Sequence, residues 1–253
     1  MKEYLKKLTD VVDSMSVTSG HDSGLWGLAG MPQMQSALLQ LVEHLKVNNR
    51  NGNKVIVIGN GGSAAIASHV AIDLNKNAGI RALALNDASA LTCLSNDYGY
   101  DKVFAKQIEY HGRPREILVA ISSSGKSLNI LKAVEEARLF KMYIVTFSGF
   151  EPYNQLRQAG NMNFYVPSSE YGFVELAHQI FLHAVTDALG EQRKAQDANM
   201  AGIVPRDLKP MGGNPAPAAN KMNKDGSWPY DPLTNPNPGI SPFSPELSKR
   251  VRE

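Results

Sequence analysis

The stretch KVIVIGNGGSAAIASHVAIDLNK, residues 54–76, decides the fold of this chain. It opens with a short β-branched run that ends at a glycine, which is typical of a strand buried on both faces. A turn of small residues follows, and then a segment with helix-like composition. A strand, a glycine-rich turn and a helix in this order predict the first unit of a parallel α/β sheet.

The same alternation continues to about residue 189. The further strand-like runs are RALALN (81–86), EILVAIS (116–122), MYIVTFS (142–148) and MNFYVPS (162–168), and the helix-like runs are SALTCLSND (89–97), SLNILKAVEEARLF (127–140) and FVELAHQIFLHAVTDAL (173–189). Strands that alternate with helices of this length form a parallel sheet covered on both faces. With right-handed crossovers, the sequence predicts a three-layer α/β/α sandwich with a doubly wound, mostly parallel sheet.

Two further regions flank this predicted domain, which spans residues 51–190. Residues 1–50 read as two amphipathic helices with a loop at SVTSGHDSGLWGLAG, 16–30, and we expect the helices to pack on the core or in an oligomer. Residues 191–253 hold ten of the fourteen prolines. They predict an extended tail, either mobile or docked through Trp228, Tyr230 and Phe243.

The bulk composition narrows the class of protein. The net charge is +2, and no run of Lys and Arg stands out, so neither nucleic acid nor a membrane surface is an expected partner. Cys93 is the only cysteine, which fits a reducing compartment. The chain shows neither a signal-peptide pattern nor an apolar run long enough to cross a bilayer. We expect a cytoplasmic protein.

Two turns of small and hydroxyl-bearing residues follow two of the predicted strands. The first contains Asn60, Gly61, Gly62 and Ser63, and the second contains Ser122, Ser123, Ser124 and Ser127 around a glycine. Hydroxyl groups and free backbone N–H groups at a helix N-terminus suit a phosphate monoester. Both turns lie at carboxyl ends of parallel strands, so we expect them to share one ligand. Serines are also common N-caps, but four of them around one glycine favour phosphate binding.

The first turn alone also fits a relaxed dinucleotide fingerprint, with Asp87 as a conceivable ribose ligand. The serine-rich second turn suits a monophosphate better, and the chain lacks a separate substrate domain. We therefore expect no nucleotide cofactor.

Two pairs of residues on helices are the acid–base and metal candidates. His69 and Asp73 are four residues apart and share one helix face. Glu175 and His183 are eight residues apart and about 80° apart around their helix. Two imidazoles and two carboxylates suit zinc or a similar divalent ion. A single histidine in such a helix is more often structural, and we expect that role for His178.

The motifs GNGGSA (59–64), NDYGYD (96–101) and ISSSGKS (121–127), with a late helix ending in FLHAV, resemble the SIS (sugar isomerase) family. Over about residues 35–190 they are similar to its sedoheptulose 7-phosphate isomerase branch. The resemblance implies an SIS domain, an aldose–ketose isomerase, and a homotetramer with sites completed by neighbouring subunits. The tail is not part of the resemblance.

The resemblance also implies roles for particular residues. The family carries a histidine and a glutamate where this chain has His69 and Asp73, and a glutamine and a histidine where it has Glu175 and His183. Some relatives bind one zinc ion through this set of four. The implied acid–base groups are His183 with Asp73 or Glu175. We expect the second turn to hold the phosphate, while Asn60, Ser63 and Asp97 contact the sugar.

The expected reaction converts sedoheptulose 7-phosphate to D-glycero-D-manno-heptose 7-phosphate through an enediolate, for heptose synthesis in lipopolysaccharide or capsule. The alternative is a non-catalytic SIS protein that resembles the branch associated with the bacterial replication initiator. That branch lacks the late histidine, which His183 supplies here. The sequence therefore favours an enzyme.

Overall fold

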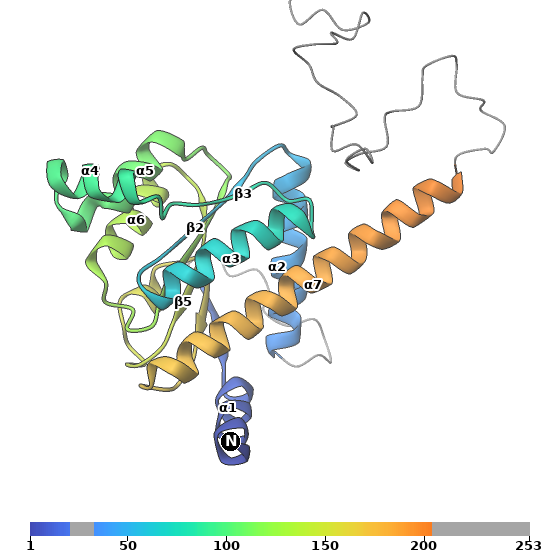
Figure 1. Cartoon of the computed structure of the whole chain (residues 1–253), viewed down its shortest axis with the longest axis horizontal. Coiled ribbons are helices and arrows are strands. Elements are labelled where there is room, and N and C mark those ends of the chain that lie inside the picture. Colours follow the sequence, from blue (N-terminus) through green and yellow to red (C-terminus); the bar gives the residue numbers. More distant parts are fainter. Residues whose placement is uncertain (21–32, 204–253) are drawn as a thin grey trace, which may run out of the picture. The chain divides into compact units, whose positions relative to one another are not determined.

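The computed structural model describes residues 1–20 and 33–203 of the chain (Figure 1). Residues 1–201 form one compact unit. The aromatic residues proposed to anchor the tail lie outside the described residues.

A six-stranded sheet, in the order β1-β6-β5-β4-β2-β3, forms the middle of this unit. The strands are β1 (Ser16–Ser19), β2 (Val55–Gly59), β3 (Ala82–Ala84), β4 (Ile117–Ser122), β5 (Tyr143–Ser148) and β6 (Met162–Tyr165). Strands β2 to β6 run parallel to one another, whereas β1 pairs antiparallel with β6. The order steps outward from β2 and β4 in both directions, so the prediction of a doubly wound, mostly parallel sheet is confirmed.

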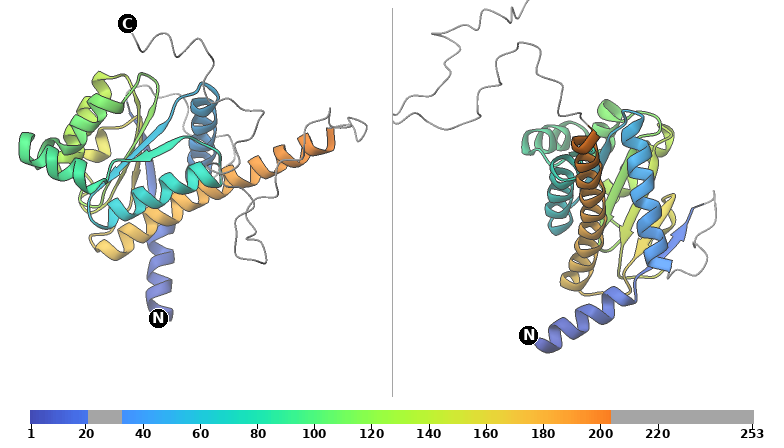
Figure 2. Two further views of the ribbon diagram at one scale, coloured as in Figure 1. Left: turned by 45° about the horizontal axis from the view of Figure 1, so that its top comes forward. Right: turned by 90° about the vertical axis from the view of Figure 1, so that its right-hand side faces the viewer.

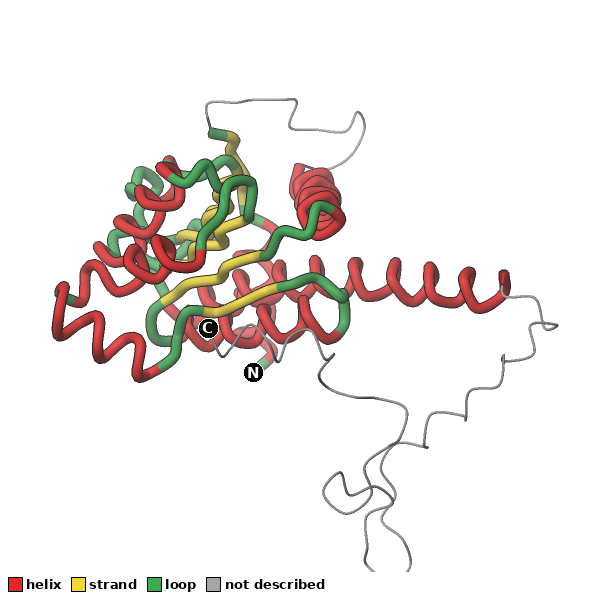
Figure 3. Tube along the Cα trace, turned by 90° about the horizontal axis from the view of Figure 1, so that it is seen from above, coloured by secondary structure: helices red, strands yellow, loops and turns green. Residues whose placement is uncertain are grey.

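Helices cover both faces of the sheet, as Figures 2 and 3 show. The helices are α1 (Lys2–Asp13), α2 (Gln33–Arg50), α3 (Gly62–Lys76), α4 (Ala88–Tyr98), α5 (Val103–His111), α6 (Leu128–Leu139) and α7 (Tyr171–Ile203), with 3₁₀ turns at Tyr100–Lys102 and Leu156–Gln158. Alternate residues of the strands enter two separate cores. Val57 packs with α2, α3 and α7, whereas its neighbour Ile58 packs with α4, α5 and α6. The three predicted layers are therefore present.

The predicted loop at 16–30 is wrong for its first four residues. Ser16–Ser19 form β1, which pairs with β6 and buries Val17 at 1% exposure. A four-residue edge strand with one buried side chain gives too short an alternation to be read from sequence. The rest of that predicted loop, 21–30, lies outside the described residues.

Helix α7 is longer than expected. It continues to Ile203, so the tail predicted to be extended from residue 191 is helical over 191–203. This segment, EQRKAQDANMAGI, is rich in residues of high helix propensity, and the first proline after it is Pro205. The prolines later in the tail lie beyond this segment and therefore do not interrupt its helix.

In the described part of the chain, no helix is long and apolar enough to cross a membrane.

Candidate active site

The turn after β2 places a helix N-terminus at the carboxyl edge of the sheet. Gly61 has φ +53°, a conformation that costs a glycine little, and it is the N-cap residue of α3. Asn60 and Ser63 flank the two glycines. The N–H groups of the first turn of α3 therefore face the end of the sheet, as predicted for an anion-binding turn.

The turn after β4 repeats this arrangement on the neighbouring strand. Gly125 has φ +63°, and its N–H donates to the carbonyl oxygen of Ser122 at 3.0 Å. The Oγ of Ser122 donates to the Oγ of Ser127 at 3.1 Å, which closes the turn before α6. The buried Oγ of Ser123 has no hydrogen-bond partner among the described residues. The turn thus gathers hydroxyl groups at the N-terminus of α6.

The two turns line one cavity of about 240 Å³ together with the start of α7. Its lining residues are Asn60, Gly61, Gly62, Ser63, Ser122, Ser123, Ser124, Ser127, Tyr171 and Glu175. The structure therefore brings together all but one of the residues predicted to bind substrate. The exception is Asp97, which is exposed on α4 and accepts a hydrogen bond from Asn96 at 2.9 Å.

Glu175 reaches this cavity from α7 and lies against the N-terminus of α3. A Cβ atom built on Gly62 would be 2.5 Å from both carboxylate oxygens of Glu175. A glycine at this position therefore leaves the space that the carboxylate occupies. A negative charge is favourable beside the first turn of a helix, where the helix dipole has its positive end.

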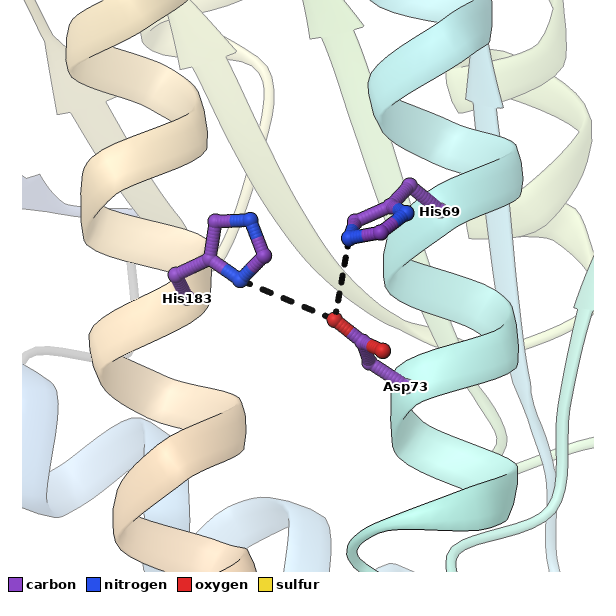
Figure 4. A group of neighbouring side chains, drawn as sticks. All are labelled: His69, Asp73 and His183. Carbon is purple, nitrogen blue, oxygen red and sulfur yellow. Dashed lines mark ion pairs between the residues drawn. The ribbon is translucent and has the colours of Figure 1, made fainter.

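A second group of side chains joins α3 to α7 farther along the two helices (Figure 4). The Oδ2 atom of Asp73 lies 3.3 Å from Nε2 of His69 and 3.6 Å from Nδ1 of His183. The two imidazole rings meet edge to face, with their centroids 5.1 Å apart. Both the i, i+4 pair on α3 and its convergence with His183 are therefore present.

One potential ligand atom from each of these three residues lies within 4.8 Å of the others. Two imidazoles and a carboxylate are a donor set that zinc accepts, so the three residues fit a divalent ion. Glu175, the fourth predicted ligand, is outside this group and lines the serine cavity instead. The structure thus separates the predicted set into a triad and a pocket carboxylate.

His183 has a partner on each ring nitrogen. Its Nδ1 faces Asp73, and its Nε2 lies 3.3 Å from the side-chain nitrogen of Gln179. Because an amide nitrogen only donates, this pairing favours the tautomer with the proton on Nδ1, the nitrogen that faces Asp73. Asp73 therefore orients the ring of His183.

Several residues at the site were missed by sequence reasoning. Tyr171 lines the cavity, and Gln179 contacts His183. Asn129 pairs with Asn60, and both of these hydrogen bonds measure 2.9 Å. A helical spacing of four between Gln179 and His183 was the one signal available for these contacts. His178, predicted to be structural, is fully buried and bonds through Nε2 to the carbonyl oxygen of Ser148 at 3.1 Å.

Comparison with known proteins agrees with this fold. Residues 29–149 match a family model described as the SIS domain. A phosphoheptose isomerase from Helicobacter pylori is 36% identical over 162 residues, which is 62% of this chain and 84% of the relative.

Two solved structures are also similar. A phosphoheptose isomerase from Neisseria gonorrhoeae is 33% identical with a TM-score of 0.54, over 62% of this chain and 85% of that one. A phosphoheptose isomerase from Francisella tularensis is 25% identical with a TM-score of 0.61, over 75% and 96%. Fold and site together define an SIS domain protein. Within that class, the chain belongs to the phosphoheptose isomerase family.

Proposed function

We propose that this protein is an aldose–ketose isomerase that converts sedoheptulose 7-phosphate to D-glycero-D-manno-heptose 7-phosphate. The observation that carries the proposal is the pairing of His183 with Asp73 on two helices that also line a serine-rich cavity. An oriented imidazole and a carboxylate supply the acid–base groups, and the serines supply a phosphate site.

The distance between the two parts of the site suits a long, phosphorylated sugar. Glu175 and His183 are eight residues apart on α7, which is about 12 Å along the helix axis. An extended seven-carbon chain with a terminal phosphate has a comparable length. With its phosphate on the serines, such a substrate would place its first two carbons near Asp73 and His183.

The chemistry proposed for these residues is a balanced proton transfer. A base removes a proton from C1 of the ketose, and the electrons form the enediolate with C2. The base exchanges this proton with solvent and returns a proton to C2, while a proton moves from the C1 oxygen to the C2 oxygen. We assign the carbon proton to Asp73 and the oxygen proton to His183, because the two side chains lie 3.6 Å apart. Glu175 would lie beside the phosphate, at the other end of the substrate.

His69, Asp73 and His183 would hold one divalent ion such as zinc, with Glu175 reaching the group only if its side chain turns. When bound, the ion would polarise the substrate carbonyl and stabilise negative charge on its oxygen.

We further propose a cytoplasmic homotetramer with sites completed by neighbouring subunits. Large apolar side chains are exposed on the helices that carry the triad, including Ile72 at 55% and Ile180 at 42%. On α1, Tyr4 and Leu5 are exposed at 44% and 53%. Contact with a second copy of the chain would bury these surfaces. Light scattering after size-exclusion chromatography measures the oligomeric state, and a monomeric mass would contradict this proposal.

The alternative function is a non-catalytic SIS protein that binds a protein partner. The contact of His183 with Asp73 favours catalysis, because a binding role does not need an oriented imidazole. Pull-down of a replication initiator by a protein without sugar turnover would support the alternative instead.

The experiment that tests the proposed reaction compares turnover of sedoheptulose 7-phosphate by the wild type, His183→Ala and Asp73→Asn. We expect each substitution to lower kcat by at least about 100-fold, since general acid–base groups contribute on that scale. His111→Ala is the matched control, because this histidine is exposed on α5 and outside the site. Wild-type activity in His183→Ala would rule out the assignment.

A further inference from the structure

A reciprocal pair of amides connects the two turns of the cavity. Asn60 follows β2, and its Nδ2 donates to Oδ1 of Asn129 at 2.9 Å. In return, Nδ2 of Asn129 donates to Oδ1 of Asn60, also at 2.9 Å. Asn129 lies in the first turn of α6, is 3% exposed and does not line the cavity. It therefore contacts Asn60 from behind the site.

One further hydrogen bond determines which way round the two amides lie. The backbone N–H of Ile130 donates to Oδ1 of Asn129 at 3.0 Å, which identifies that atom as the oxygen. The hydroxyl of Tyr100 donates to Oδ1 of Asn60 at 3.2 Å. Exchanging oxygen and nitrogen in either amide would place a donor against a donor. The orientation of Asn60 is thus set by its neighbours.

The hydrogen-bond capacity of Asn60 shows what it can offer to a ligand. Its Oδ1 accepts from both Asn129 and Tyr100, which uses the two lone pairs. Its Nδ2 carries two hydrogens, and one of them goes to Asn129. The second has no partner among the described residues, and Asn60 lines the cavity. The free group at this position is therefore a donor.

We propose that Asn129 is a positioning residue that holds the amide of Asn60 so that an N–H donor faces an oxygen of the bound sugar phosphate. The inference rests on the proposed function, since it names how that site recognises its substrate. Without Asn129, the Asn60 amide is free to rotate and to present its oxygen, which would repel a phosphate or hydroxyl oxygen. The contact exists in the bound ground state, so its loss affects KM rather than kcat.

A double-mutant cycle separates this role from a general effect on the fold. Asn129→Ala should raise KM for sedoheptulose 7-phosphate by about tenfold, the scale of one well-placed hydrogen bond, with kcat within about threefold of the wild type. In an Asn60→Ala background, Asn129→Ala should change KM no further, because Asn129 acts through Asn60. Equal effects of Asn129→Ala in both backgrounds would overturn the proposal.

Two more variants test the proposal if Asn129→Ala does not fold. Asn129→Asp keeps the shape and the acceptor for Ile130 but loses the donor to Asn60, so it should raise KM as well. Tyr100→Phe removes the other bond to Oδ1 of Asn60 and should act more weakly in the same direction. Its matched control is Tyr153→Phe, since Tyr153 is 86% exposed. Unchanged KM in a folded Asn129→Asp would contradict the proposal.

A measurement on the free protein keeps this inference separate from the proposed reaction. In ¹⁵N-labelled wild type, one side-chain hydrogen of Asn60 should exchange slowly with solvent, and Asn129→Asp should remove that protection. If the wild type neither binds nor converts the sugar phosphate, the proposed function fails. The amide signals still show whether Asn129 holds the side chain of Asn60. Equal exchange of Asn60 in both proteins would show that Asn129 does not position it.

Discussion

The Nδ1 atom of His183 lies 3.6 Å from the Oδ2 atom of Asp73, and this contact joins α7 to α3 (Figure 4). The Asp73 side chain is 16% exposed, whereas the side chains of His183 and His69 are 39% and 50% exposed. The carboxylate is thus the least accessible member of the triad and fixes both rings. The acid–base pair and the metal-binding set that we propose share these three side chains.

Metal binding should depend on His69, the member of the triad to which we assign no proton transfer. We expect one zinc ion per chain by isothermal titration calorimetry, and at least about tenfold weaker binding in His69→Ala, because one of three ligands is lost. His44→Ala is the control, since His44 lies on α2 and stacks on Tyr143. Equal zinc affinity in His69→Ala would show that the triad is not the metal site.

Replacing Glu175 should improve substrate binding. Its carboxylate lies in the cavity where we place the phosphate, so the two negative charges repel. Glu175→Gln keeps the shape and removes the charge. We expect KM for the sugar phosphate to fall by about threefold, the scale of a charge repulsion in a solvated pocket, with kcat largely retained. A large loss of kcat would instead assign Glu175 a proton-transfer role.

The sequence predicts best those features of the fold and site that depend on residues close together in the chain. The strands after residue 50 are mostly apolar runs, and His69 and Asp73 share a helix face, so both are visible in sequence. By contrast, β1 is only four residues long. Helix α7 continues to Ile203, although residues 191–203 were assigned to the tail because of the prolines that follow them. Short edge strands, and boundaries placed from amino-acid composition, are therefore predicted least well.

The sequence also could not predict which residues from different helices and turns contact one another within the site. The position of Glu175 against Gly62 follows from how α7 packs on α3, and spacing along α7 alone cannot give it. The same holds for Asn129, whose partner lies on a different strand–helix turn. Spacing identified the residue types needed for chemistry, and packing decided which of them meet.

The glycine of the serine-rich turn should be needed for stability. Gly125 has φ +63°, and a Cβ there would collide with the buried side chain of Asn154. We expect Gly125→Ala to lower the free energy of unfolding by at least about 2 kcal/mol, from backbone strain and disrupted hydrogen bonds. Gly190→Ala is the opposite case, because Gly190 lies within α7 and an added Cβ would be 3.7 Å from the nearest atom, the carbonyl oxygen of Asn77. It should raise stability by up to about 1 kcal/mol.

Denaturant unfolding measures both variants. The two should move in opposite directions, and a neutral Gly125→Ala would show that the turn is less constrained than the structure indicates.

His178 should make the fold sensitive to acid. Burial lowers the pKa of His178 from 6.5 to about 4, although the bond to the carbonyl oxygen of Ser148 acts in the opposite direction. Between about pH 6.5 and 4, the unfolded chain binds a proton that the folded chain does not. Stability from this group is therefore complete above about pH 7 and falls by about 3 kcal/mol as the pH drops to 4.

The difference between wild type and His178→Met isolates this contribution from that of other groups. The free energy of unfolding of His178→Met should vary less between pH 7 and 4, while His111→Gln should follow the wild type because His111 is exposed. Identical pH profiles for wild type and His178→Met would contradict the prediction.

Proton NMR of the reaction in D₂O shows whether this protein isomerises a sugar phosphate through an enediolate. We predict that purified protein with sedoheptulose 7-phosphate yields the aldoheptose 7-phosphate with deuterium at C2, because the abstracted proton exchanges with solvent before it returns. His183→Ala should yield neither product nor exchange. If the wild-type protein, with zinc supplied, leaves the substrate unchanged and every carbon-bound proton in place, the account of this site as an isomerase is wrong.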